Sequence, residues 1–373
     1  MDNLTHTLFG VTLARTPLSR AGRGTTAALI LASNAPDIDI VALARGPVSY
    51  LRWHRGPTHG PLGLVGLSVL SAAVVWIGRT LYDRRRTTER LVDEDQDASF
   101  HMLIAVSAIG VLLHVLMDVP TSYGTRIFSP FDWHWFAVDL MPIIDVYLLA
   151  ALLAGILFGQ QSASARRRNV GIVMTLMAAN YGVRAVAHHE ALALVPRLFG
   201  PTLPQRCDAT RPSGAPVDVW PTRASSTAAL STRCLVDLAA MPTFTSPFRW
   251  RVILQLSNAY EIRDVDLLDA RWRGSEDESG APWRTTVRYP NVWTPTVARA
   301  ATTDLGRVFL GFSRFPAARS AVDSHGVTTV RWTDVRFAAG LIALEQPRPG
   351  PDIFTAIVRV APDGEVIQQR LGR

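Results

Sequence analysis

The sequence predicts an α-helical membrane bundle of about four to six transmembrane or re-entrant helices, followed by a β-rich soluble C-terminal domain. The chain has 373 residues, of which 48% are hydrophobic, and its mean hydropathy of +0.15 is high for a soluble protein of this length. Nearly all long apolar runs lie in residues 1–200, whereas residues 201–373 are rich in Arg, Trp and Pro. We therefore expect two domains, a transmembrane domain over 1–200 and an extracytoplasmic β-rich domain over 201–373.

The positive charge of the chain comes entirely from arginine. The formal net charge is +7, and the sequence contains no lysine. These arginines are scattered through loops and through the C-terminal half, and they form no basic stripe interleaved with aromatic residues. Such a stripe is typical of nucleic-acid-binding proteins, so we expect no nucleic-acid partner.

A series of apolar segments in the N-terminal half is expected to enter or cross the membrane. The first is short and is a candidate for a re-entrant segment, and the second is interrupted by Asn34 and Pro36. Proline frees a backbone carbonyl, which is tolerated in a membrane where the freed group lines a cavity. The expected segments are 4–14, 25–44, 61–77, 101–119, 136–158 and 170–195.

The arginines also predict the orientation of the chain, because positive residues gather on the cytoplasmic side. Arginines follow segment 61–77 and precede segment 170–195, and both groups should be cytoplasmic. Alternation then places loop 119–135 and the C-terminal half outside. Loop 45–56 is also outside in this scheme, and its own arginines argue against it. The protein is expected to be multi-pass in the inner (plasma) membrane. The cytoplasmic groups are Arg79, Arg84, Arg85, Arg86, Arg90 and Arg166–Arg168.

The C-terminal half contains short segments enriched in β-branched and aromatic residues and separated by Pro, Gly and Asp. We expect strands at 249–256, 260–268, 307–315, 327–337, 353–360 and 365–371. Cys207 and Cys234, the two cysteines of the chain, both lie here and could pair in an oxidising compartment, which the sequence leaves open. This half offers no catalytic constellation, and His325 is its one histidine.

Carboxylates and imidazoles interrupt the apolar segments. Asp37 and Asp39 lie in a broken segment, and His54 and His59 flank a Gly-Pro turn. A charge within hydrocarbon is costly, so such residues are functional candidates. Taken singly, the first pair could be a helix cap at the Pro break, and the second could belong to a polar interfacial loop.

His114 and Asp118 are four residues apart, so a helix presents both on one face. This spacing also occurs by chance in many helices. The predicted orientation, however, brings all these polar residues to the same outer face, which favours a single site. A mixed His/Asp set suits zinc, with manganese as the alternative, better than it suits calcium. The residues on that face are His6, Asp37, Asp39, His54, His59, His114, Asp118 and His188.

At these residues the chain resembles a known family. The ordered series is 2-DNLTH-6, 34-NAPDID-39, 54-HRGPTH-59 and 114-HVLMD-118, continued by 121-TSYGT-125, 130-PF-131 and 143-IID-145. It resembles the bacterial inner-membrane proteins described as LexA-regulated, membrane-bound, predicted metal-dependent hydrolases (YdjM-like), over about residues 1–190. The order of the motifs is more loosely similar to that of zinc-dependent phospholipase C.

The resemblance implies roles for individual residues. The implied metal ligands are more than one ion needs, so one or two ions are expected. Asp39 and Asp145 are candidates for a general base or for a carboxylate that orients a ligating imidazole. Arg52, Arg55 and Arg184 are candidates for holding an anionic group, with interfacial anchoring as the alternative. The implied metal ligands are His6, Asp37, His54, His59, His114 and Asp118.

The function that follows is that of a membrane-bound metal-dependent hydrolase. We expect it to act on a lipid or a lipid-linked (phospho)ester at the outer face of the inner membrane. A transporter or proton-relay protein is an alternative, because buried Asp and His also mark ion pathways. Clustering at one face favours the hydrolase, since a relay distributes such groups through the membrane. A third alternative is a non-enzymatic scaffold with a structural metal, whose C-terminal domain binds a protein partner.

Overall fold

The structure is a computed structural model of the chain, and tertiary contacts group it into two compact units. It describes residues 1–85, 96–158, 162–200, 203–207, 209–210, 220, 223–224, 233–268, 287–337 and 354–372. The first unit comprises Met1–Ile40, Arg55–Asp132 and Phe136–Val186. The second comprises Val41–His54, Trp133–Trp135 and Ala187–Arg373. Two short segments of the N-terminal half therefore pack with the C-terminal half.

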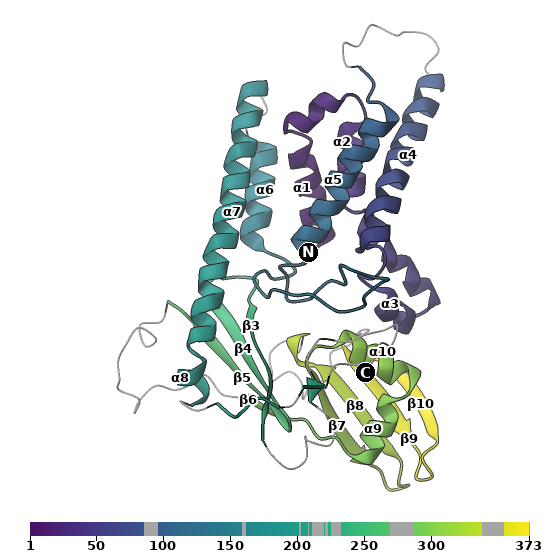
Figure 1. Cartoon of the computed structure of the whole chain (residues 1–373), viewed down its shortest axis with the longest axis vertical. Coiled ribbons are helices and arrows are strands. Elements are labelled where there is room, and N and C mark those ends of the chain that lie inside the picture. The colour runs from purple at the N-terminus through teal and green to yellow at the C-terminus, as the bar shows by residue number, and fades with distance from the viewer. Residues whose placement is uncertain are drawn as a thin grey trace. The chain divides into compact units, whose positions relative to one another are not determined.

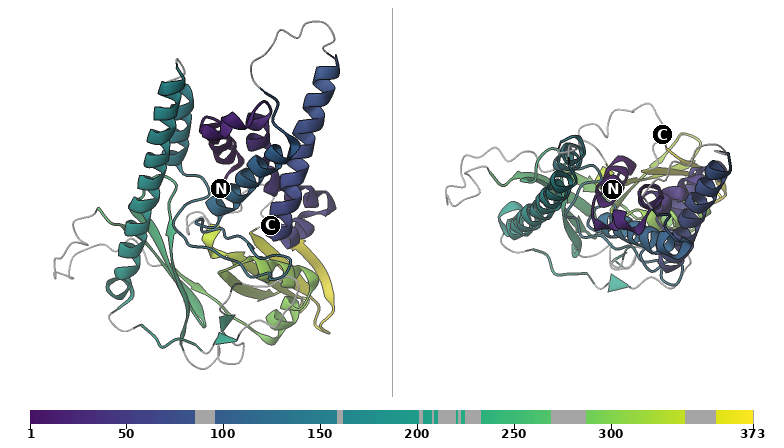
Figure 2. Two further views of the ribbon diagram at one scale, coloured as in Figure 1. Left: turned by 45° about the horizontal axis from the view of Figure 1, so that its top comes forward. Right: turned by 90° about the horizontal axis from the view of Figure 1, so that it is seen from above.

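The first unit is a bundle of apolar helices. Figures 1 and 2 show α1, α2 and α5 packed together, α4 against α5, and α6 beside α7. Among the residues that the structure describes, three helices are long and apolar enough to cross a membrane, or four if the bent pair of α2 and η2 is one span. The helical membrane bundle is thus confirmed. The helices are α1 (Asn3–Leu13), η1 (Pro17–Ala21), α2 (Thr25–Ala32), η2 (Ala35–Arg45), α4 (Pro61–Arg85), α5 (Phe100–Asp118), α6 (Val146–Leu157) and α7 (Ala163–Ala193).

The break between α2 and η2 is held by side-chain hydrogen bonds. The two helices are bent by 46°. The Asn34 amide donates to the carbonyl of Ile30 at 2.9 Å, while its side-chain oxygen accepts from Thr7 Oγ1 at 3.2 Å. These bonds satisfy polar groups that the break would otherwise leave unpaired. The polar interruption seen in the sequence therefore has a fixed conformation.

Glycine allows α2 to lie close to α5. A Cβ added at Gly110 of α5 would lie 2.9 Å from the Cβ of Ala32 and 3.3 Å from the backbone nitrogen of Ser33. Small residues permit such close approach between membrane helices, where dispersion contacts replace the hydrophobic effect as the driving force. Gly110 is therefore the contact point that fixes α5 against the end of α2.

The segment expected to span the membrane over 136–158 is helical only from Val146, the start of α6. Pro142 has no backbone N–H to donate, and Asp139 adopts a left-handed conformation with φ of 59°. Asp145 then caps the helix, since its carboxylate accepts the N–H of Leu148 at 2.8 Å. Residues 119–145 consequently form a long loop, and the expected continuous helix was wrong in its first part.

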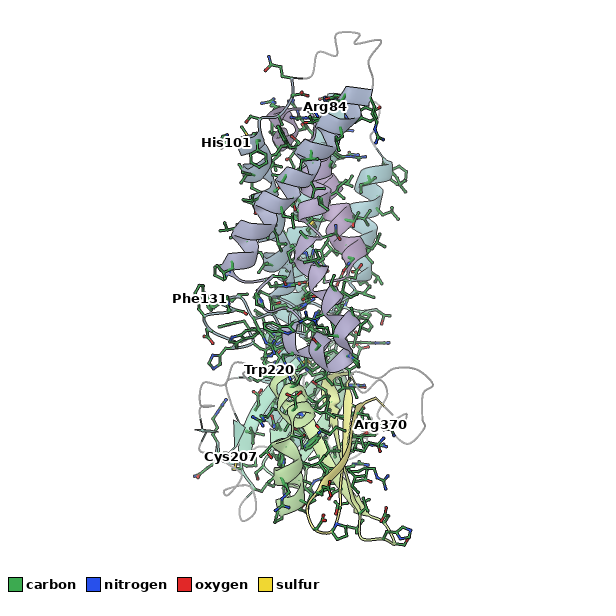
Figure 3. All side chains as sticks on the ribbon, turned by 90° about the vertical axis from the view of Figure 1, so that its right-hand side faces the viewer. Arg84, His101, Phe131, Cys207, Trp220 and Arg370 are labelled. Atoms are coloured by element: carbon green, nitrogen blue, oxygen red, sulfur yellow. A yellow bond between two sulfur atoms is a disulfide. The ribbon has the colours of Figure 1, made fainter. Side chains whose placement is uncertain are left out.

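Arginine and aspartate side chains pair at one end of the bundle. Figure 3 shows Arg84 and His101 at one end and Phe131 toward the other. At the first end, Arg23 pairs with Asp83 and, at 2.8 Å, with Asp97, and these carboxylates raise the pKa of Arg23 above its usual range. Two further arginines expected here, Arg86 and Arg90, lie outside the described residues.

The second unit contains two four-stranded antiparallel sheets, in the orders β3-β4-β5-β6 and β10-β9-β8-β7. Its β-rich character is confirmed. Two further helices, α3 and α8, belong to this unit. The elements are α3 (Pro47–Trp53), α8 (Val195–Phe199), β1 (Ala209–Thr210), β2 (Arg223–Ala224), β3 (Leu235–Pro242), β4 (Arg249–Leu256), β5 (Ala259–Asp266), β6 (Val287–Pro290), α9 (Pro295–Ala301), α10 (Asp304–Phe312), β7 (Pro316–Val322), β8 (Thr328–Asp334), η5 (Val335–Phe337), β9 (Thr355–Val360) and β10 (Val366–Leu371).

The strand expected over 307–315 is instead helix α10. Thr303 caps it, because its hydroxyl accepts the N–H of Gly306 at 3.0 Å. Leu305, Val308, Phe309 and Phe312 are all buried, and they follow the spacing of one helical face. The β-branched and aromatic composition of this segment suggested a strand, but its period is that of a helix.

Cys207 and Cys234 form a disulfide, with Cα atoms 5.0 Å apart. The N–H of Cys207 also donates to the carbonyl of Leu235, at the start of β3, at 2.8 Å. The bond therefore ties the chain that leaves α8 to the first sheet. The question that the sequence left open is answered in favour of pairing.

Replacing Gly110 with Val should destabilise the helical unit. The added side chain would meet Ala32 and the backbone of α2, and overpacking of this kind costs about 1–3 kcal/mol. Thermal unfolding in detergent should show a lower Tm. Gly66→Val is the matched control, since a Cβ at Gly66 meets nothing within 4 Å. Equal Tm values for the two variants would contradict the packing described above.

Candidate metal centre

Four side chains from three parts of the first unit converge on one point. Asp37 comes from η2, His59 from the turn before α4, and His114 and Asp118 from one face of α5. Each offers one donor atom, and these atoms all lie within 4.8 Å of one another. His59, His114 and Asp118 are buried, whereas 15% of the Asp37 side chain is exposed. The group therefore opens on the side of Asp37.

Five of the six distances between the donor atoms are close to those around a single small ion, and the sixth, between Asp37 and Asp118, is within 4.8 Å. His59 Nε2 lies 3.3 Å from His114 Nε2. The distances from these two nitrogens to Asp118 Oδ2 are 3.4 and 3.5 Å, and those to Asp37 Oδ1 are 3.6 and 3.7 Å. Ligand bonds of about 2.0–2.2 Å around zinc separate neighbouring donors by about 3.3–3.6 Å. The four residues could therefore hold one metal ion.

Neighbouring groups turn the ligating nitrogens toward this point. The Nδ1–H of His114 donates to the carbonyl of Ser33 at 2.7 Å, so its Nε2 carries the lone pair. His59 Nδ1 lies 3.1 Å from the hydroxyl of Thr58, which leaves its Nε2 facing the group. Metal-ligating histidines commonly use the second ring nitrogen in this way. This feature supports a metal centre over an unrelated polar cluster.

His6 of α1 adjoins the other side of Asp118. Its ring stacks on that of His114 with centroids 3.8 Å apart, and its Nε2 lies 3.4 Å from Asp118 Oδ1. Both ring nitrogens of His6 and both oxygens of Asp118 are buried and make no hydrogen bond to the described residues. The amino group of Met1 pairs with the same Oδ1. Asp118 Oδ1 therefore has the Met1 amino group as its cationic partner, with His6 beside it.

Arg55 is held beside Asp118 in an uncommon backbone conformation. Its φ is 50°, in the left-handed region, which costs a residue with a side chain about 1–3 kcal/mol. Three contacts hold it there: its backbone N–H donates to Asp39 Oδ2 at 2.6 Å, Nη1–H donates to the carbonyl of Gly124 at 3.0 Å, and Nη2 lies 3.2 Å from Asp118 Oδ2. The guanidinium is thus fixed at the metal centre.

Asp39 contacts Arg55 and the second ring nitrogen of His59, which is the nitrogen that does not face the group of four. Its Oδ2 accepts the Arg55 N–H and lies 3.9 Å from His59 Nδ1. The carboxylate therefore supports an arginine and an imidazole. Whether it also takes part in catalysis, as the sequence suggested, stays a prediction.

The other predicted site residues lie in different surroundings. His54 belongs to the second unit, where its Nε2 lies 3.4 Å from Tyr50 Oη, and Arg52 pairs with Asp304 at 2.5 Å. Asp145 and Arg184 form a fully buried ion pair at 2.5 Å between α6 and α7. The structure therefore does not bring these four residues into the group around Asp118, and their site roles stay predictions.

Sequence reasoning missed the groups that orient the histidines. The partner of His114 is the backbone carbonyl of Ser33, which no residue pattern can mark. The hydroxyl of Thr58 directly precedes His59, but a serine or threonine beside a histidine is common. The sequence also did not indicate the left-handed backbone at Arg55. Glycine is the residue that favours this conformation, but the glycine here is Gly56, one position later.

Comparison with known proteins decides the family. The model of the YdjM inner membrane protein family matches residues 1–191, more than half of the chain and all of the metal centre. The chain belongs to the YdjM inner membrane protein family. Membership confirms the resemblance seen in the sequence, and it assigns this protein to the inner membrane.

One curated relative is the protein YfhP of Bacillus subtilis (strain 168), which is described as uncharacterized. It is 29% identical over 164 residues, which are 42% of this chain and 45% of YfhP. The alignment thus spans less than half of either protein. No solved structure matches this chain.

The purified protein should carry a first-row divalent metal, and His114→Ala should lose it. Removing one of the four donors weakens the binding of the metal ion. It also leaves the buried carboxylate of Asp118 with less compensation of its charge. Metal content by elemental mass spectrometry checks this. The matched control is His101→Ala, which removes an exposed histidine from the other end of α5 and should retain the metal. Wild-type protein without stoichiometric metal would contradict the centre.

Proposed function

We propose that this chain is a metal-dependent hydrolase that acts on a lipid or lipid-linked phosphoester at the outer face of the inner membrane. The observation that carries the proposal is the set of four converging donor atoms with oriented imidazoles. The partial exposure of Asp37 leaves a side by which substrate can reach the centre. A catalytic zinc keeps one coordination position for water or substrate, so in this proposal the partly exposed Asp37 is the donor that gives way to them.

The donor set favours zinc, with manganese as the alternative. A bound divalent ion supplies Lewis-acid activation of water and of a phosphoryl oxygen. The chain's own contribution is to fix the ligands. The Ser33 carbonyl holds the tautomer of His114, and the helical spacing of His114 and Asp118 presents both from one rigid element.

Arg55 is the group best placed to hold an anionic substrate. Its guanidinium is a fixed cation next to the ligand Asp118, and a planar fork of N–H donors matches phosphate oxygens. The left-handed backbone and the bond to Asp39 keep it in place before substrate binds, so little ordering is needed. A substrate phosphate would compete with Asp118 for these donors.

His6 supports the proposal of a second ion. Asp118 turns Oδ2 to the group of four and Oδ1 to His6, which is the arrangement of a carboxylate that bridges two cations. Two-ion sites stabilise both the attacking and the leaving oxygens of a phosphoester. In this proposal His6 and Asp118 provide the second position, and substrate or water completes it.

The outer location rests on charge and on the disulfide. Arginines gather at the ends of α4 and at the start of α7, which the positive-inside rule assigns to the cytoplasm. The bond between Cys207 and Cys234 is typical of an oxidising, extracytoplasmic compartment. Both features support a C-terminal domain outside the cell membrane. Substrates at that surface are lipids or lipid-linked compounds.

A proton-relay or transport function is supported by one separate observation. Asp145 and Arg184 form a buried pair between α6 and α7, and Asn180 donates to the same carboxylate at 3.2 Å. Intramembrane ion pairs of this kind mark ion pathways in some proteins. Asp145 also caps α6, which gives the carboxylate a structural role as well.

The zinc-loaded protein should hydrolyse phosphoesters, and Arg55→Gln should slow the reaction about 10²-fold or more. Loss of one preorganised donor for developing negative charge typically has an effect of about this size. The assay uses bis(p-nitrophenyl) phosphate and phosphatidylglycerol in mixed micelles. His6→Ala should keep one ion per chain and lose most activity if the reaction needs two.

The matched control is Arg249→Gln, which removes an exposed arginine from β4. It should leave the rate unchanged. A wild-type protein that holds its metal yet hydrolyses none of these substrates would instead favour a structural metal in a scaffold. Activity that survives in His114→Ala would place the chemistry elsewhere.

Labelling of single cysteines should place Phe131 outside and Ser164 inside. Phe131→Cys lies in the 119–145 loop with 76% of the side chain exposed, and Ser164→Cys precedes the Arg166–Arg168 triplet. In intact spheroplasts a membrane-impermeant maleimide should modify only the first. The parent protein is the control, since both of its cysteines are in the disulfide. Labelling of Ser164→Cys but not of Phe131→Cys would contradict the outer location of the C-terminal domain.

A further inference from the structure

The sheet β10-β9-β8-β7 of the second unit buries one of its faces against helices. Helices α9 and α10 contact β8 and β9, and Gln369 Oε1 of β10 accepts the N–H of Leu305 of α10 at 3.2 Å. Val330 and Trp332 of β8 are fully buried on this face. Successive side chains of a strand point to opposite faces, so Arg331 belongs to the other face.

Four arginines lie together on that other face. Arg319 of β7 is directly opposite Arg331 of β8. Ile357 of β9 is the register partner of both Arg331 and Arg370 of β10, and Arg359 follows it by two residues on the same face. The first, second and fourth strands expose their arginines, and 39% of the Arg359 side chain is exposed. We call these four residues the arginine face.

The other sheet of this unit pairs its arginines with carboxylates. Arg249 is directly opposite Asp266, and Arg251 is directly opposite Asp264, each with its Nε 2.8 Å from a carboxylate oxygen. Opposite charges on facing strand positions stabilise a sheet, whereas like charges there destabilise it. On the arginine face, the residue opposite Arg319 is another arginine. This face therefore carries a charge arrangement that works against the stability of the sheet.

Neighbouring groups compensate the arginine face only in part. Arg359 pairs with Asp323, in the turn between β7 and β8, at 3.3 Å. This pair is exposed on both sides, and such pairs contribute little. Among the residues that the structure describes, neither Arg331 nor Arg370 forms an ion pair. Uncompensated positive charge thus remains at the solvent surface.

We propose that the arginine face binds a polymer of phosphodiester groups. Two directly opposed side chains have Cβ atoms about 4.5–5.5 Å apart, so the guanidinium groups of Arg319 and Arg331 can reach one anion. A phosphate group offers oxygens on several sides and can accept from two guanidinium groups, whereas the two oxygens of a carboxylate match one. The guanidinium of Arg319 also lies over the ring of Tyr289, 5.1 Å from its centroid, which favours a fixed position.

The second pair of arginines makes the site multivalent. Arg359 is opposite Gln368, two residues from Arg370, so these arginines are diagonal neighbours across β9 and β10. Diagonal neighbours are within reach of each other's long side chains. The face therefore offers a second place for a phosphate group, and a ligand with repeated phosphates can occupy both. Binding at this face is separate from the metal centre and does not depend on the proposed hydrolase activity.

The remaining positions of the face argue against a nucleic acid. They are small, aliphatic or polar, and none is aromatic, so the strands offer no platform on which bases stack. A phosphodiester polymer without bases needs no such platform. These positions are Ala321, Thr329, Ile357 and Gln368.

The test measures the binding of synthetic poly(glycerol phosphate) to the metal-loaded full-length protein in phosphatidylcholine nanodiscs by titration calorimetry. The double variant Arg319→Gln/Arg331→Gln removes the opposed pair. We expect it to bind the polymer about tenfold or more weakly, because charge-assisted hydrogen bonds to phosphate are lost. The dependence of the affinity on salt concentration should also become shallower, since fewer phosphates are neutralised.

The matched control is Arg249→Gln/Arg288→Gln. It removes the same charge from the first sheet, from two arginines whose side chains are each 55% exposed. This variant should bind the polymer as the wild type does. His114→Ala, which is expected to lose the metal, should also still bind the polymer.

Arg331→Glu separates binding from folding. It places a carboxylate opposite Arg319, as in the pairs of the first sheet, so the Tm should stay the same or rise. Polymer binding should nevertheless fall by at least as much as in the double variant. A lower Tm would mean that Arg331 contributes to the fold, which contradicts the role proposed here.

Four results would overturn the inference. A wild-type protein that does not bind the polymer rejects it, and so does unchanged affinity in Arg319→Gln/Arg331→Gln. Polyglutamate of equal charge binding as tightly as the phosphate polymer would instead indicate an acidic protein as the partner. Loss of polymer binding in His114→Ala would place the polymer at the metal centre. Failure of the hydrolase proposal appears separately, in the assays of phosphoester hydrolysis.

Discussion

The structure of the helical unit depends on one buried carboxylate. Asp118 is fully buried at the end of an apolar helix, and isolated negative charge in such a place is costly. Imidazoles, the Arg55 guanidinium and the Met1 amino group surround it. These groups come from α1, the 54–59 turn and α5 itself, so compensation of one charge brings together parts of the chain that are far apart in sequence. A divalent cation would complete this compensation.

The close packing of α2 on α5 serves the same charge. Gly110 and His114 are four residues apart, so they lie on the same face of α5. Gly110 lets the end of α2 approach, and this approach places the Ser33 carbonyl 2.7 Å from His114 Nδ1. The break after α2 then turns Asp37 toward the same point. Helix packing and ligand orientation are therefore one constraint, and a larger residue at position 110 disturbs both.

The sequence predicted the helical bundle, the β-rich second half and the four donors, because each depends on local composition or spacing. Hydropathy marks α4 and α5, and the helical repeat marks His114 with Asp118. It failed where the outcome depends on tertiary packing. The strand expected over 307–315 is α10, whose β-branched and aromatic residues are stabilised as a helix by the burial of its apolar face. His54 and His59 flank one turn in the sequence but belong to different units, so the role predicted for His54 stays a prediction.

The family match sharpens what the C-terminal half contributes. It ends at residue 191, so the donors and Arg55 lie within the family region, whereas both sheets and α10 lie beyond it. Yet α3 and Trp135, which lie within the family region, are packed in the second unit. A domain that only tethered a partner would not need to enclose segments from between the site residues. Segment 41–54 leaves the helical unit after Ile40 and re-enters it at Arg55, so the second unit is built from family-region residues as well as from the C-terminal half.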